Sequence, residues 1–175
     1  LAKKFVEAFM PVGTKVILRT HEKGKYGRYL GDFKVGKKWL CKELLKHHSF
    51  THKNYSHPKS ENGFLGMLRP FKGELNESNF HELMSILKIL KNNFFRENVE
   101  RDLISNFWGI CHLSKSWGIE ESGMLRRNNL ISEKQVELLS DWIDCISYAV
   151  MNLLEDNENE AFENYKHYLE EQNEK

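Results

Sequence analysis

The chain has 175 residues, of which 40% are hydrophobic and 29% charged, and its formal net charge is +1. This composition is typical of a globular protein, and it argues against a membrane protein because no apolar run approaches the roughly 18 residues that a span needs. Three widely spaced cysteines outside any CxxC pair favour neither a disulfide framework nor a thiolate zinc site, so we expect a cytoplasmic protein.

The near-neutral total hides an asymmetry between the two halves of the chain. Residues 1–75 contain 16 Lys and Arg against 6 Asp and Glu, net +10, whereas residues 76–175 contain 10 against 19, net −9. The basic half predicts a surface that binds a polyanion, and the acidic half predicts a surface for the basic half or for a protein partner. Two solvated surfaces without a ligand are the simpler alternative.

The basic half predicts a helix, a hairpin and a second helix. Pro11 and Gly13 end the first helix, and β-branched residues after them indicate a strand. In chain order we expect a helix at 2–10, a strand at 14–20, a turn at 21–25, a strand at 29–35, a turn at 36–38 and a helix at 39–48. From His47 to about Asn76 no period is sustained, which favours a linker or mobile loop.

The acidic half shows the 3.6-residue period of amphipathic helices. We expect helices at about 80–95, 99–116, 132–155 and 158–173. Ser132 and Gln135 have the spacing of a capping box, which fixes the start of the third of these helices. Because that helix is apolar on more than one face, it should lie at the centre of a bundle.

The most specific motif of the chain is Lys25-Tyr26-Gly27-Arg28, which joins the two strands of the hairpin. With its flanks it resembles staphylococcal nuclease-like (thermonuclease) domains, where a helix, a strand and a basic turn precede a KYGR-centred hairpin. A short strand and a helix follow the hairpin in the family, and Lys42-Glu43-Leu44-Leu45-Lys46 takes the place of that helix here. The resemblance covers residues 1–58 and implies part of an OB-fold.

The resemblance implies roles for individual residues. Arg28 matches a catalytic arginine that stabilises the charge developing on the phosphate, for which a guanidinium is well suited. Lys25 and Tyr26 are expected on the substrate. Tyr55 and His57 occupy the positions of two tyrosines that hold a phosphate, and the histidine is a departure from the family that still permits donation to a phosphate.

Three further parts of the family's site have no counterpart in this sequence. The calcium-binding aspartates, a first arginine and the general-base glutamate belong to strands that precede the helix matched by residues 2–10. The resemblance thus implies calcium as the cofactor, and it predicts an N-terminal segment that carries these groups. No metal ligand is assigned within the sequence itself.

Other residues suggest weaker hypotheses. His48 and His52 have a spacing that allows two imidazoles on one metal, so a zinc or HNH-like site is an alternative to solvated histidines near a polyanion. The loop 126–129, Arg-Arg-Asn-Asn, precedes a helix and is either a phosphate or carboxylate site or an exposed polar loop. Tryptophans with core-like spacing, Trp108, Trp117 and Trp142, are expected to pack inside. Asp141 and Asp144 are expected on an outer face.

Together these patterns predict an α+β protein with a partial thermonuclease-like OB-fold element (1–58), a linker (59–77) and an all-α helical bundle (78–175). The expected function is nucleic-acid binding, DNA or RNA, with phosphodiester hydrolysis if an N-terminal segment completes the site. The alternative is a non-catalytic interaction protein, in which a degenerate OB element is joined to a helical domain that binds a protein partner.

Overall fold

The computed structural model describes residues 2–23, 29–49, 62–95 and 97–173. The basic half contains α1 (Ala2–Phe9), β1 (Ile17–Lys23), β2 (Tyr29–Val35), β3 (Lys38–Trp39) and α2 (Leu40–His48). Next come the short α3 (Phe64–Leu68), α4 (Glu77–Leu90) and the 3-10 turn η2 (Lys91–Asn93). The chain continues with α5 (Arg101–Ser114), the π-helical turn η3 (Lys115–Ile119), α6 (Met124–Arg127), α7 (Glu133–Leu154) and α8 (Glu163–Asn173). No described helix is long and apolar enough to cross a membrane.

The three strands form an antiparallel sheet in the order β1-β2-β3. Arg19 lies opposite Asp32 in the register, and an irregularity in β1 follows Thr20. Gly36, with φ of +58°, makes the tight turn between β2 and β3, which a residue without Cβ adopts most readily. The mixed α and β class is thereby confirmed. Across the described residues the sheet is open, so its assignment to a partial OB-fold stays a prediction.

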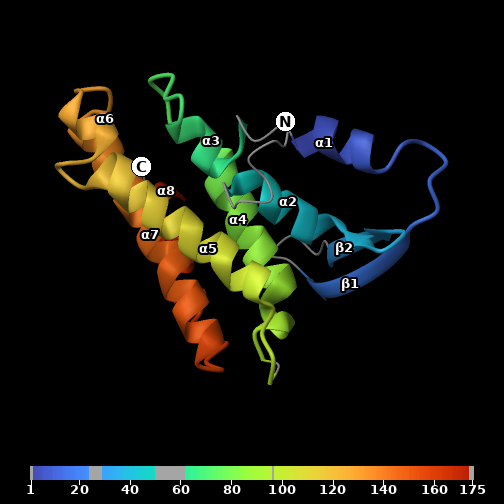
Figure 1. Cartoon of the computed structure of the whole chain (residues 1–175). Helices are drawn as coiled ribbons and strands as arrows, with labels where there is room; N and C mark the ends of the chain where they lie inside the picture. The colour runs from blue at the N-terminus through green and yellow to red at the C-terminus, as the bar shows by residue number, and fades with distance from the viewer. Residues whose placement is uncertain (1, 24–28, 50–61, 96, 174–175) are drawn as a thin grey trace.

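The helices α4, α5 and α7 form the bundle (Figure 1), and α8 packs on α7 and on the start of α4, where Tyr168 donates to Glu77 at 2.6 Å. The predicted capping box is confirmed: the Ser132 hydroxyl accepts from the Gln135 amide at 3.3 Å, and the Gln135 side chain accepts from the Ser132 amide at 3.0 Å. The predicted central position of α7 is also confirmed, because Trp142 is fully buried and stacks on Phe80 of α4 at 5.4 Å.

The helix α2 joins the sheet to the bundle. It contacts β2 on one side and α4 and α5 on the other. Its residues Leu40, Leu44 and Leu45 belong to the same continuous core as the bundle helices. The buried carboxylate of Asp32 accepts a hydrogen bond from the backbone amide of Cys41 at 3.1 Å, so β2 supplies the cap that α2 lacks at its own N-terminus. The sheet and the bundle are therefore fixed relative to each other.

Several details differ from the predictions. The segment expected to lack regular structure contains α3, whose Phe64 and Leu65 are fully buried. At Gly63 the chain passes so close to α2 that a Cβ would lie 2.0 Å from the His47 carbonyl oxygen. Trp108, expected in the core, is 64% exposed and stacks on His112, and α6 lies in a stretch expected to be a loop. The domain boundaries at 58 and 77 stay a prediction.

Candidate functional site

The residues predicted to act on a substrate fall outside the described part of the chain. Lys25, Tyr26 and Arg28 lie within 24–28, between the end of β1 and the start of β2. Tyr55 and His57 lie within 50–61, between α2 and α3. Their roles stay predictions. The site is therefore built here from the described side chains around the hairpin.

Among the described side chains of the hairpin and α2, basic residues dominate the surface because the two acidic ones, Asp32 and Glu43, are engaged internally. Asp32 is 4% exposed and holds the start of α2. Glu43 is mostly buried and accepts from Lys46 Nζ at 2.8 Å, with Lys38 Nζ at 3.9 Å. Lys37 and Lys38, at the β2–β3 turn, are exposed. A surface with this balance attracts polyanions.

A cleft of about 420 Å³ lies where the hairpin meets the bundle, and we call it the hairpin cleft. The guanidinium carbon of Arg19 lies 4.5 Å from the centroid of the Trp39 ring, and Lys34 Nζ lies 5.5 Å from it. These are cation–π distances, so Trp39 holds Arg19 in a defined position. The cleft is lined by Arg19, Thr20, Asp32, Trp39 and Lys42 from the basic half and by Ile89, Leu90, Asn92, Asn93 and Glu100 from the helical half.

A salt bridge crosses the hairpin cleft between the two halves. Lys42 Nζ of α2 lies 2.5 Å from Glu100 Oε1 and 2.7 Å from Glu100 Oε2, just before α5. Asn92 and Asn93 of η2 stand on the same side as Glu100. Among the described residues, neither asparagine side chain has a hydrogen-bond partner. The cleft thus offers amide groups that are ready to bond a ligand.

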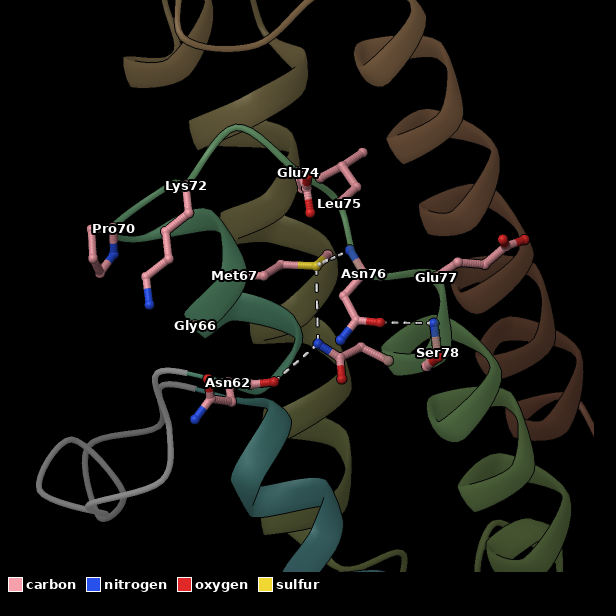
Figure 2. A pocket seen from close by; sticks show the side chains of 11 residues that line it. Asn62, Gly66, Met67, Pro70, Lys72, Glu74, Leu75, Asn76, Glu77 and Ser78 are labelled. Atoms are coloured by element: carbon pink, nitrogen blue, oxygen red, sulfur yellow. Dashed lines mark hydrogen bonds between the residues drawn. The ribbon is translucent and has the colours of Figure 1, made fainter. Parts of the chain in front are cut away.

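A second pocket, of about 360 Å³, lies at the loop between α3 and α4 (Figure 2). Its polar groups are largely used within the loop: the Met67 sulfur accepts from the Asn76 amide at 3.2 Å, and the Asn79 side chain donates to the Asn62 carbonyl at 3.1 Å. Asn76 also caps α4 by accepting from the Ser78 amide at 3.1 Å. These bonds shape the loop, while the exposed charged side chains of Lys72 and Glu74 also line the pocket.

A buried histidine pair occupies the end of α2. His48 Nδ1 accepts from the Phe64 amide at 3.1 Å, and His48 Nε2 lies 3.5 Å from Glu82 Oε2 of α4. Burial raises the pKa of Glu82, but the close contact with His48 and the charges of His48 and His47 bring it below its usual value. No group of three or more potential metal ligands is found in the described part of the chain. His52, the other half of the metal hypothesis, lies outside it.

The remaining residues singled out from the sequence either have structural roles or lie outside the hairpin cleft. Arg126 donates to the Ile119 carbonyl at 3.1 Å and pairs with Glu133 at 2.9 Å, so it closes the loop before α7. Asp141 and Asp144 are exposed, as expected, and Asp144 lies 3.9 Å from Lys115 Nζ. Trp117 is half-buried. None of these residues lines the hairpin cleft.

Sequence reasoning missed the residues of the hairpin cleft as a set. The predicted strand and helix contain Arg19, Trp39 and Lys42, but no binding role was predicted for these residues. Asn92 and Asn93 belong to a stretch expected to continue a helix, whereas they form the 3-10 turn that ends α4. The only available signal was the Asn-Asn pair itself, because asparagine favours helix ends over helix interiors.

The fold and the site define a mixed α and β protein in which a basic three-stranded element is packed on an acidic helical bundle. Comparison with protein-family models, curated proteins and solved structures finds no significant match to the chain.

Proposed function

We propose that this protein binds nucleic acid through its basic half and that this half is a thermonuclease-like element. The single observation that carries the proposal is the positive surface of the hairpin and α2, whose acidic side chains Asp32 and Glu43 are engaged internally while Lys37 and Lys38 face solvent. Arg19, exposed on β1 next to the hairpin cleft, adds to this cationic surface. The KYGR-centred motif at 25–28, between β1 and β2, supports the same reading.

Phosphodiester hydrolysis is an extension of the proposal that needs more than the described residues. Arg28 would stabilise the negative charge on the phosphate, with Lys25, Tyr26, Tyr55 and His57 on the substrate. The described residues do not fit a calcium site, because no cluster of three or more His, Cys, Asp and Glu is present among them. We therefore derive no step through calcium; an N-terminal segment that carries the carboxylates, an arginine and the base would complete the site.

Binding is tested by fluorescence anisotropy with labelled single-stranded DNA and RNA between 50 and 200 mM salt. Counterion release predicts that log K falls linearly with log salt, by about 0.7 for each phosphate contact. The double variant Lys37→Glu/Lys38→Glu should bind at least about tenfold more weakly at 50 mM salt and show a shallower slope. Lys134→Glu, an exposed lysine on α7, is the matched control and should bind like the wild type.

The assay has a clear negative outcome. Absence of salt-dependent binding at 50 mM salt, or equal loss in both charge variants, would contradict a nucleic-acid surface on the hairpin. Hydrolysis is tested separately by calcium-dependent cleavage with wild type and Arg28→Ala. Activity lost only in Arg28→Ala supports hydrolysis. Equal activity in the two proteins, or none in either, favours a non-catalytic protein.

One observation favours the second candidate, a non-catalytic interaction protein. The edge strand β1 exposes apolar side chains on both faces, with Ile17 61% and Leu18 53% exposed. Its outer edge has no partner strand among the described residues. Edge strands of this kind accept an added strand from another chain. A protein partner that protects the β1 amides from hydrogen exchange, in a chain without nucleic-acid affinity, would identify this alternative.

A further inference from the structure

The hairpin cleft has a different electrostatic character from the surface outside it. Two cations, Arg19 and Lys42, line it together with two carboxylates, Asp32 and Glu100. Lys42 and Glu100 neutralise each other through two short contacts. The two cations and two carboxylates of the lining leave the cleft with no net formal charge, so it matches a neutral polar group better than an anion.

The helical wall of the cleft supplies both donors and acceptors of hydrogen bonds. Asn92 is exposed and Asn93 half-buried, and each carries one amide NH₂ and one carbonyl. Within the described chain these amides have no other partner. Side-chain amides pair with the donor and acceptor edges of nucleobases, which is the usual means of recognising an unpaired base.

The opposite wall supplies a flat group. The guanidinium carbon of Arg19 lies 4.5 Å from the centroid of the Trp39 ring, so the cleft has a planar cation and an aromatic ring side by side. Bases stack on guanidinium planes as well as on aromatic rings. The volume of about 420 Å³ lies in the range of small-ligand pockets and is enough for one nucleoside.

We propose that the hairpin cleft binds one nucleobase of a single-stranded nucleic acid whose phosphates lie on the hairpin, with Asn92 and Asn93 on the base edge and Arg19 on its face. This inference rests on the proposed function and adds base selectivity to it. It also gives the helical half a part in recognition, because η2 forms the base-reading wall.

The test uses the full chain and short labelled strands that share length and phosphate number. The strands are oligo-dA, oligo-dC and oligo-dT, their RNA counterparts and an abasic strand; nucleoside 5′-monophosphates are added as competitors. A base in the cleft should make the preferred strand bind about tenfold more tightly than the abasic strand. The best and the worst base should differ by about fivefold or more.

The double variant Asn92→Ala/Asn93→Ala isolates the base contacts. It should lose most of the preference among bases while its affinity for the abasic strand stays that of the wild type. Asn164→Ala, an exposed asparagine on α8, is the control and should keep the preference. Thermal unfolding of all three proteins verifies that the folds are equal.

The results separate this inference from the proposed function. Salt-dependent binding that is equal for base-bearing and abasic strands would overturn the base pocket alone, as would a preference that survives in Asn92→Ala/Asn93→Ala. Tighter binding of a nucleoside monophosphate than of any strand would overturn the assignment to a strand. Failure to bind every strand, the abasic one included, would overturn the proposed function itself.

Discussion

Leu45 on α2 tests whether the basic element and the helical bundle fold as one unit. The side chain is 2% exposed and belongs to the core shared with α4 and α5. Leu45→Ala removes about three buried carbon groups, worth about 0.8 kcal/mol each, and leaves a cavity that adds to the loss. A cleft of about 100 Å³ between α2 and α5 already borders Leu45, so little collapse is available. We expect a loss of about 3 kcal/mol.

The assay is urea and thermal unfolding followed by far-ultraviolet circular dichroism. In a chain of this size a loss of about 3 kcal/mol lowers Tm by roughly 6–12 °C. One cooperative transition should shift as a whole, because α2 is part of both regions. Leu154→Ala, at a 44% exposed position on α7, is the matched control and should change stability by less than about 0.5 kcal/mol. Two transitions, of which only one moves, would refute the shared core, as would equal effects of the two variants.

Three further predictions concern buried polar groups. The pKa of Glu82 in the folded protein lies below its ordinary value, so the ionised carboxylate stabilises the fold above the ordinary pKa, and this stabilisation is lost as pH falls through the folded pKa. Glu82→Gln should therefore lower the free energy of unfolding at pH 7. In urea unfolding, the difference between the variant and the wild type should shrink below about pH 4. The Tyr168 hydroxyl accepts from Trp142 Nε1 at 2.9 Å and donates to Glu77 at 2.6 Å. Tyr168→Phe should therefore lower the free energy of unfolding by about 2 kcal/mol in the same assay. The control Tyr148→Phe should be nearly neutral. Burial raises the pKa of Cys111 to about 12 and that of Cys145 to about 11, so few of these thiols are ionised at pH 8. Iodoacetamide at pH 8 should therefore modify both cysteines slowly until urea unfolds the chain. Rapid labelling of the native protein, measured by mass spectrometry, would contradict this prediction.

The elements predicted well are those whose signals are local. The capping box fixed the start of α7 because Ser132 and Gln135 satisfy each other's backbone without help from the rest of the fold. The strand β2 and the following turn were predicted because β-branched and aromatic residues precede Gly36, whose positive φ suits glycine. In contrast, β1 begins at Ile17 rather than at 14, because pairing with β2 and not propensity decides where the ladder starts.

The elements predicted poorly depend on tertiary contacts. The five residues of α3 are too few to show a helical period, so this helix was not predicted. Its burial depends on the close approach of Gly63 to His47, which is a tertiary contact. Trp108 was assigned to the core on spacing, but it lies one residue beyond the buried Phe107, and that step of about 100° turns it to solvent. The hairpin cleft was missed for the same reason, because Trp39 and Asn93 meet only through packing.

The placement of charge explains how an acidic half can coexist with a nucleic-acid surface. The wall that η2 contributes to the hairpin cleft consists of two neutral amides, and Glu100, which the helical half also places in the cleft, is paired with Lys42. The exposed glutamates Glu170 and Glu171 stand on α8, which packs on α7 and contributes no residue to the hairpin cleft. The part of the helical half that faces the hairpin cleft is thus less acidic than its net charge of −9 over residues 76–175 indicates, because Asn92 and Asn93 are neutral and Glu100 is paired with Lys42.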